Sequence, residues 1–251
     1  FINFLLAFGM LPVAYMRLIA RELHLDEVGQ AKLLAGTSLR PADMTSMDQQ
    51  VDEADQAIVL HNALAISGDP ALGLRWGSHL HVTAHGPLGV LMSTSANLEA
   101  AWQAAARYYA VRERVVELVC EQRGNELVLR FRLHLPADVV GLFFLESVLV
   151  SVQRIAVLIL GNAATREHVS VELGYPAPVY AERYADYLRC ACHFGAVDTI
   201  LRVPLALAQR PNPCADIMLY QQALTRCEEL MQSRQDSSHW SERTIRLLRQ
   251  N

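Results

Sequence analysis

Three histidines in the first third of the chain have the residue type and spacing that could hold a metal ion. His79, His81 and His85 follow the pattern H-x-H-x3-H, and the first two would share one face if the segment formed a strand. Three imidazoles can bind zinc. No carboxylate or cysteine stands nearby to complete the set, and the surrounding glycines indicate a structural turn. We therefore expect no metal ion here.

A second cluster, Cys190, Cys192 and His193, invites a thiol or metal interpretation. On a strand the two cysteines point to one side and the histidine to the other, which separates the group. The better hypothesis is that both cysteines are small buried hydrophobes. The chain has five cysteines without the regularity of a disulfide framework, and it shows no secretion signal. Together these features predict a protein of the reducing cytoplasm.

The sequence contains no recognisable catalytic set. It has no G-x-S-x-G nucleophile elbow, no phosphate loop and no H-E-x-x-H zinc motif. We therefore predict a protein that is not an enzyme, with no catalytic residues and no cofactor. A metal- or thiol-dependent enzyme that uses the histidines or Cys190 and Cys192 is the alternative.

Two groups of side chains could instead bind a small molecule. Arg130, Arg132 and His134 alternate along one face of a predicted strand. An acidic ligand would find paired guanidinium groups there, and a simply hydrated sheet face explains the same pattern. Aromatic residues could line a pocket with polar edges, although core packing explains most of them. The candidate ligand-binding residues are Trp76, His81, Tyr108, Arg130 and Arg132.

The elements that must position these residues form an α+β domain. Apolar spacing predicts helices over 15–23, 26–34 and 48–66 and after a cap at Ser95 or Asn97. A hairpin is expected around Arg123-Gly124-Asn125, followed further on by three strands and a short helix. The predicted strands span 115–121, 126–134, 169–173, 190–194 and 199–203. The predicted short helix spans 180–188. This pattern predicts a mainly antiparallel sheet covered by helices, with a helical N-terminal segment and a C-terminal linker helix.

One apolar run, Val139 to Leu160, is long enough to cross a membrane but carries Glu146, Gln153 and Arg154. Asp138 and Gly161 supply a start and a stop. We predict a helix buried inside the domain and no membrane partner. The composition agrees, with 52% hydrophobic and 19% charged residues. A net charge of −4 provides no attraction to nucleic acid, so an element that reads DNA would be small or missing.

The chain changes character after Pro204. Residues 210–213 form a stiff Pro-containing connector, and a helix is expected over 215–232. A polar break at 233–239 would separate this helix from a short helical piece at 241–250. Three leucines on the apolar face of the first helix are the candidate dimerisation residues: Leu219, Leu224 and Leu230.

Several blocks, in order, carry a family resemblance. They read LGLRWGS (72–78), AHGPLG (84–89), STSANLEA (93–100), VELGYPAP (171–178) and CHFGA (192–196). Over residues 15–232 the chain resembles the effector-binding, arabinose-binding-like N-terminal domain of AraC/XylS transcription regulators. A paired helix-turn-helix module follows this domain in the family, and residues 241–250 resemble its first helix.

The resemblance implies a division into an effector-sensing domain (1–210), a linker and dimerisation helix (211–235) and the start of a truncated helix-turn-helix domain (236–251). The expected partners are a small-molecule effector and a second copy of the chain, with DNA bound only through the missing C-terminal module. The effector would bind one conformation better and so change how the linker helix pairs or presents that module. A free-standing small-molecule-binding protein is a further alternative.

Overall fold

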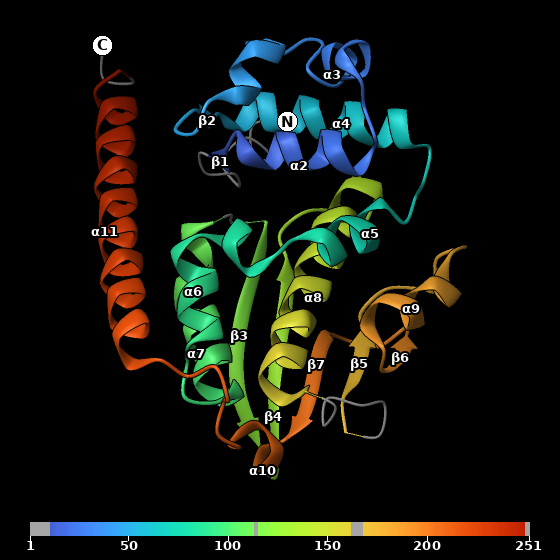
Figure 1. Cartoon of the computed structure of the whole chain (residues 1–251), viewed down its shortest axis with the longest axis vertical. Coiled ribbons are helices and arrows are strands. Elements are labelled where there is room, and N and C mark those ends of the chain that lie inside the picture. Colours follow the sequence, from blue (N-terminus) through green and yellow to red (C-terminus); the bar gives the residue numbers. More distant parts are fainter. Residues whose placement is uncertain (1–10, 113–114, 162–167, 249–251) are drawn as a thin grey trace.

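A five-stranded sheet supports the helical layers of the molecule (Figure 1). A computed structural model describes residues 11–112, 115–161 and 168–248, and for Glu53 and residues 234–248 it describes the backbone alone. The sheet has the order β3-β4-β7-β5-β6, and only the β5–β6 pair is parallel. The strands are β3 (Val116–Arg123), β4 (Glu126–Leu133), β5 (Ser170–Leu173), β6 (Ala191–Phe194) and β7 (Thr199–Pro204). The mainly antiparallel α+β fold predicted from the sequence is confirmed.

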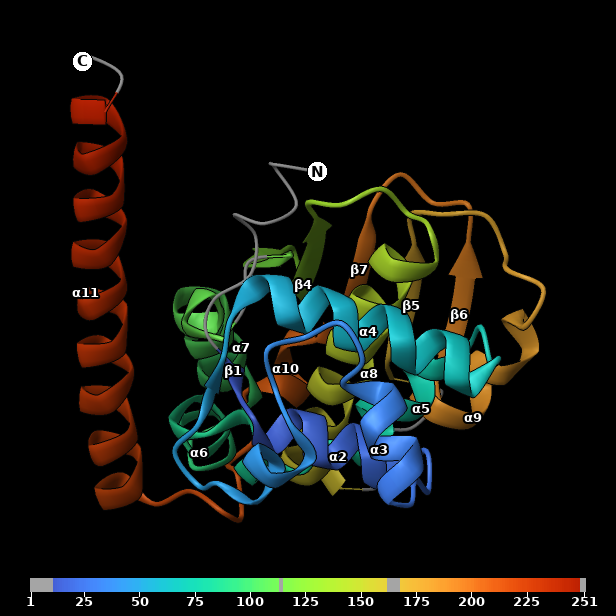
Figure 2. The ribbon, with the colours of Figure 1, turned by 90° about the horizontal axis from the view of Figure 1, so that it is seen from above.

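One face of the sheet carries the core, and the other carries charged side chains. Leu127, Leu129 and Phe131 of β4 are buried, whereas Arg130 and Arg132 on the other face are not; Val128 on that face is buried as well. The helices α7 (Leu98–Tyr108) and α8 (Val139–Leu160) cover the apolar face (Figure 2). This alternation follows from the period of two along a strand.

Helix α8 lies at the centre of the helical layer. The Asp138 side chain accepts hydrogen bonds from the N–H groups of Val140 and Gly141, and Gly161 ends the helix at φ +59°. Its length and hydropathy would suit a membrane span, but 72% of its most apolar 18-residue stretch is buried inside the domain. The predicted core helix is therefore confirmed.

The glycine-containing segment Leu72–His79 forms the helix α5, where the sequence indicated a turn. A Cβ atom on Gly73 would lie 2.8 Å from the Cα atom of Phe143, and one on Gly77 would lie 2.6 Å from the carbonyl oxygen of Ser147. The two glycines therefore allow α5 to pack directly on the backbone of α8. His79 ends α5 and His81 precedes a 3-10 turn, so the two histidines do not share the face of a strand.

A second hydrophobic cluster joins the N-terminal helices to this layer (Figure 1). Met16 and Ile19 of α2, Val59 of α4, Trp76 of α5 and Phe143 of α8 are buried in it. The elements of this region are β1 (Leu11–Pro12), α2 (Ala14–Glu22), α3 (Glu27–Leu33), η1 (Pro41–Thr45), β2 (Gln50–Val51) and α4 (Glu53–Ser67). The helical N-terminal segment predicted from apolar spacing is thus present.

The connecting elements and the C-terminal helix complete the fold. The connecting elements are η2 (Val82–His85), α6 (Pro87–Ser93), η3 (Tyr109–Val111), η5 (Ala181–Arg183), α9 (Tyr184–Leu188) and α10 (Leu205–Ala208). Helix α11 (Ile217–Leu248) packs on α6, α7 and η3, and its later turns project beyond the domain (Figures 1 and 2). The predicted break at 233–239 is wrong, because that segment contains no glycine or proline to interrupt a helix.

Candidate ligand-binding site

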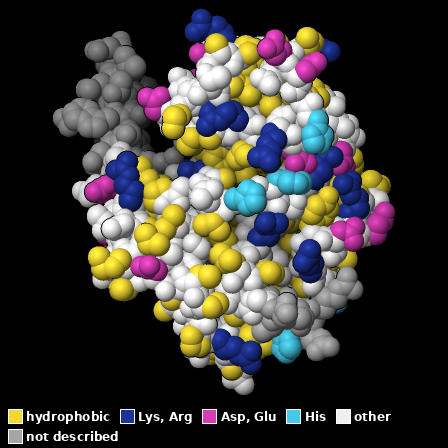
Figure 3. Space-filling model, in the orientation of Figure 1, with side chains coloured by type: hydrophobic (Ala, Val, Ile, Leu, Met, Phe, Trp, Pro, Cys, Tyr) yellow, Lys and Arg dark blue, Asp and Glu magenta, His cyan; other side chains and the backbone are white. Residues whose placement is uncertain are grey.

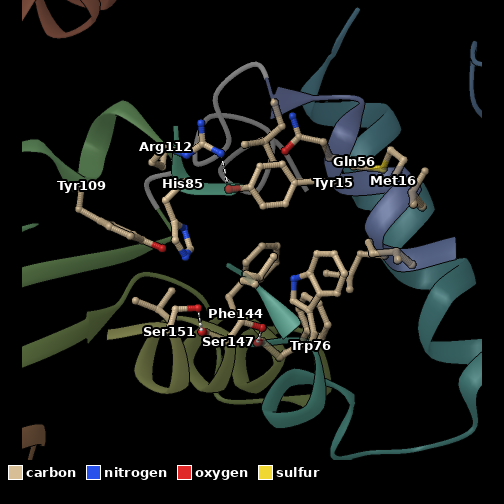
Figure 4. Close-up of a pocket in the computed structure, with 17 residues that line it drawn as sticks. Tyr15, Met16, Gln56, Trp76, His85, Tyr109, Arg112, Phe144, Ser147 and Ser151 are labelled. Atoms are coloured by element: carbon tan, nitrogen blue, oxygen red, sulfur yellow. Dashed lines mark hydrogen bonds between the residues drawn. The ribbon is translucent and has the colours of Figure 1, made fainter. Parts of the chain in front are cut away.

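A cavity lies between the N-terminal helices and α8 (Figure 4). We call it the inner cavity, and its volume is about 90 Å³. Its lining comes from β1, α2, α4, α5, α8 and the turns around η2 and η3. The lining residues are Leu11, Tyr15, Met16, Ile19, Gln56, Val59, Leu60, Trp76, Leu80, His85, Tyr109, Arg112, Phe143, Phe144, Ser147, Val148 and Ser151.

Aromatic side chains form much of the cavity wall. The ring centroids of Tyr15 and Trp76 are 6.4 Å apart, and those of Phe143 and Phe144 are 5.6 Å apart at right angles. Figure 4 shows the rings of Tyr15, Trp76 and Phe144 around one common space. Such a wall suits a ligand with a flat or apolar body.

Arg112 brings a positive charge to this apolar wall. Its Nη2 donates to the carbonyl oxygen of Ala84 at 2.9 Å and to the hydroxyl of Tyr15, whose ring lies 5.0 Å from the guanidinium carbon. Tyr15 in turn donates to the same carbonyl at 2.8 Å. Within the described part of the chain, Arg112 forms no ion pair with a carboxylate, and its buried Nε donates to no acceptor.

His85 faces the cavity beside Arg112 and Tyr109 (Figure 4). Burial, and secondarily the positive charge of Arg112, lowers the pKa of His85 to about 4. The imidazole is therefore neutral at pH 7. Since none of the described lining residues is acidic, Arg112 is the charged side chain of this lining at that pH.

The short turn η3 connects the cavity to α11. Tyr109 of η3 lines the cavity, and the neighbouring Tyr108 donates from its hydroxyl to Oε1 of Glu228 on α11 at 3.2 Å. Cys227 of α11 is fully buried in the same contact region. A change in the position of η3 would therefore reach α11 directly.

A second hollow, which we call the outer groove, adjoins the inner cavity. The two share Leu80, His85 and Ser151 as lining residues. The groove has a volume of about 780 Å³ and is lined by parts of α5, η2, α8 and α9. Figure 3 shows histidine and basic side chains gathered over these helices. Arg154 and Arg189 are two of the residues that line the groove.

The structure separates the candidate residues named from the sequence. Trp76 lines the inner cavity, whereas His81 is exposed in the outer groove. Tyr108 lines neither hollow and contacts α11 instead. Arg130 pairs with Glu121 at 3.0 Å and Asp198 at 2.9 Å, and Arg132 approaches Glu117 at 3.6 Å. Both arginines lie on the solvent face of the sheet, so the five residues do not form one site.

The candidate dimerisation leucines also differ from one another. Leu219 is exposed, whereas Leu224 packs against the domain's own core beside the buried Ala223 and Cys227. Leu230 is half-buried. The apolar face of α11 is therefore used partly within the chain.

The histidine and cysteine clusters hold no metal-ligand set among the residues that the structure describes. His79 approaches Glu22 at 2.9 Å, which occupies its ring nitrogen. Cys190 is buried and Cys192 half-buried, and neither forms a disulfide. The hypothesis that these cysteines act as small hydrophobes agrees with this placement.

Sequence reasoning missed Tyr15, His85 and Arg112 as cavity residues. Tyr15 belongs to an amphipathic helix, and Arg112 stands in the charged run RYYAVRER (107–114), which is typical of a solvated helix end. Their common position depends on the packing of α2 against η2 and η3, which no spacing within the sequence reveals.

Comparisons with known proteins agree with one family. The model described as the N-terminal arabinose-binding domain of AraC transcription regulators matches residues 28–212. The chain is 30% identical over 222 residues to the ornithine utilization regulator of Pseudomonas aeruginosa, covering 88% of this chain and 65% of that protein. It is 26% identical over 224 residues to an uncharacterized HTH-type transcriptional regulator of Mycobacterium tuberculosis and to another of Mycobacterium bovis, with the same coverage.

The solved structure of the transcriptional regulator CdpR from Pseudomonas aeruginosa shares the fold, with a TM-score of 0.56 and 14% identity. The match covers 85% of this chain and 66% of CdpR. The chain thus spans 65% of the length of the curated relatives it matches. These relatives are regulators, which confirms the resemblance seen in the sequence and does not support the enzyme alternative.

Proposed function

This chain belongs to the AraC transcription regulators, whose N-terminal arabinose-binding domain it contains. We propose that its inner cavity binds the effector of the full protein. In this proposal a helix-turn-helix module attached beyond α11 reads DNA in the cytoplasm. The observation that carries the proposal is the shared wall: η3 lines the cavity and also packs on α11. A ligand that favours one position of η3 would shift the position of α11 and of whatever follows it.

The name of the relative from Pseudomonas aeruginosa makes ornithine a first compound to test. Ornithine carries two ammonium groups, and each would need an acceptor or a negative charge if buried. The described lining of the inner cavity has no carboxylate. We therefore expect ornithine to stabilise this domain less than a ligand without an ammonium group.

A thermal-shift screen of amino acids, sugars and organic acids tests ligand binding to the cavity. A true effector binds the folded state and raises the unfolding temperature, with a gain of about 2.7 kcal/mol at 100 times its Kd. Trp76→Ala should weaken this gain, since Trp76 lines the cavity. The matched control is Trp102→Ala, which removes a buried indole outside the cavity lining. Equal loss of binding in both variants would argue that the hit binds elsewhere.

Labelling of Cys227 tests the coupling to α11. Cys227 is fully buried against the domain, and burial raises the pKa of its thiol to about 11, so it reacts only when α11 opens. A saturating hit from the screen should change the labelling rate of Cys227 at least about three-fold. Cys120, a half-buried cysteine of β3, is the internal control in the same protein. Equal labelling of Cys227 with and without ligand would contradict the coupling.

The homodimer is a further part of the proposal. Three adjacent apolar side chains at the start of α11 are exposed, Ile217 by 66%, Met218 by 62% and Leu219 by 46%. Because Leu224 is already packed inside the chain, we assign the contact between copies to this first turn. Light scattering after size exclusion should give a dimer mass for the native chain and a monomer mass for Leu219→Glu. A monomer mass for both would exclude this contact.

A further inference from the structure

Arg112 and the outer groove together indicate the chemistry of the ligand. Building on the proposed function, we infer that the effector is an organic anion with a mainly apolar body, which Arg112 holds in the inner cavity and which enters by way of the outer groove. The effector class is thereby restricted to compounds such as aryl or alkyl carboxylates.

The missing counter-charge at Arg112 is the first argument. Arg75 and Arg183 each pair with a carboxylate, at 2.9 Å to Glu22 and 2.6 Å to Asp69. Arg130 also leaves its Nε without an acceptor, yet it contacts two carboxylates. Arg112 differs because no carboxylate among the described residues contacts it. A cation in an apolar wall is unfavourable unless it is paired, so a bound anion would complete this site.

The polarity of the remaining lining is the second argument. Tyr15, Trp76, Phe143 and Phe144 surround the space, and the neutral His85 adds no charge. An apolar ligand body would pack against these rings, while one charged group would reach Arg112. A cationic ligand would instead be placed beside a guanidinium group without an acidic partner.

The entrance is the third argument. Leu80, His85 and Ser151 lie between the inner cavity and the outer groove, so the two hollows meet at these side chains. Arg154 and Arg189 are exposed along the groove and form no ion pair within the described chain. Asp186 is the acidic side chain of this lining. A groove with excess positive charge attracts anions and raises their rate of association.

Three probes with one shared body separate the charge from the shape of the ligand: 4-phenylbutyrate, 4-phenylbutanol and 4-phenylbutylamine. Isothermal titration of the native chain should show the carboxylate binding roughly 10- to 100-fold more tightly than the alcohol, as for a charge-assisted hydrogen bond. The amine should bind most weakly of the three. In Arg112→Gln the preference for the carboxylate over the alcohol should disappear, while the affinity for the alcohol changes little.

A second variant keeps the test valid if Arg112→Gln does not fold. Arg112→Lys retains the charge and should retain the preference for the carboxylate, at reduced affinity because an ammonium lacks the planar fork of donors. Loss of the preference in a folded Arg112→Lys would contradict a role for the charge.

Stopped-flow binding of 4-phenylbutyrate tests the entrance. Removing both groove cations in Arg154→Ala/Arg189→Ala should lower the association rate about ten-fold at low salt and should leave the dissociation rate unchanged. Arg132→Ala/Arg210→Ala removes the same net charge from residues outside the groove lining and should have a smaller effect. Equal effects of the two pairs would exclude the groove as the entrance.

The results distinguish this inference from the function on which it rests. Tighter binding of the alcohol or the amine than of the carboxylate would overturn the anion assignment and leave the cavity as a ligand site. Binding of none of the three probes would also overturn it, and a Trp76-dependent hit of other chemistry would then still support the proposed function. Absence of any Trp76-dependent hit would defeat both.

Discussion

Two ionisable groups inside the domain, Arg112 and Glu146, differ from the arginines on the open face of the sheet. Behind the helices, Arg112 has no carboxylate partner among the described residues, and Glu146 is fully buried. On the open face, Arg130 and Arg202 each contact two carboxylates, the latter at 3.2 Å to Glu126 and 2.8 Å to Glu172. Arg130, which the sequence offers as part of a ligand site, is thus already paired, whereas Arg112 and Glu146 contact no group of opposite charge among the described residues.

The difference teaches that desolvation, more than residue type, determines which charged groups of this domain affect its stability. A pair at the surface is hydrated in both the folded and unfolded states, so its net contribution is small. A buried group changes its protonation or its partner when its surroundings change. We therefore expect variants of the two regions to differ in size and in pH dependence.

Substitution of Glu146 should have the largest effect on the pH dependence of stability. Its Oε1 accepts from the hydroxyl of Tyr180 at 2.8 Å and from that of Tyr184, which in turn lies 2.9 Å from the hydroxyl of Tyr175. Burial outweighs these hydrogen bonds and raises the pKa of Glu146 from 4.5 to about 7. The folded state therefore keeps a proton that the unfolded chain loses above pH 4.5, and stability falls as the pH rises toward and through 7.

We expect this change to cost about 3 kcal/mol of unfolding free energy across that range, from the size of a pKa shift. Glu146→Gln cannot titrate and should remove most of the slope in urea unfolding series. The matched control is Glu172→Gln on the open face, which should leave the slope unchanged. Parallel pH profiles for the native chain and Glu146→Gln would show that the buried carboxyl is already ionised at low pH.

His85 should give a smaller effect of the opposite sign. Its folded pKa of about 4 lies below the ordinary value of 6.5, so the unfolded chain binds a proton that the folded state does not. The stability from neutral His85 is complete above pH 6.5 and is lost as the pH falls toward 4. Because the side chain is only partly shielded from solvent, we expect a loss of about 2 kcal/mol.

His85→Gln should flatten this part of the pH profile, and His193→Gln, an exposed histidine on β6, should not. Calorimetry or urea unfolding at several pH values below neutrality measures the difference. If the native chain and His85→Gln lose the same stability below neutral pH, the imidazole is protonated in the folded state as readily as in the unfolded chain.

The sequence predicts elements well where the signal is local. Asp138 and Gly161 bound α8, and Asn97 begins α7 by accepting from the N–H of Ala100, as expected from their types. The turn at Gly124, with φ +57°, joins the predicted hairpin strands. These features depend on a few adjacent residues, so the composition of one segment decides them.

The sequence did not predict the role of a residue where that role depends on contact with a distant segment. The role of Gly73 and Gly77 is set by the backbone of α8, which approaches them only in the folded chain. Arg112 becomes a cavity residue because α2 and η2 place Tyr15 and the carbonyl of Ala84 beside it. No residue spacing in the sequence predicts either contact. The resemblance to the family predicted the function but did not identify these side chains.

The smallest effect is expected on the open face of the sheet. The pair between Arg202 and Glu172 has side chains 26% and 35% exposed, so water screens it. A double-mutant cycle with Arg202→Ala and Glu172→Ala should give a coupling energy of about 1 kcal/mol or less. Added salt should reduce it further. A coupling well above that value, insensitive to salt, would mean that this face is shielded in solution, and the contrast between the two regions would then have to be drawn differently.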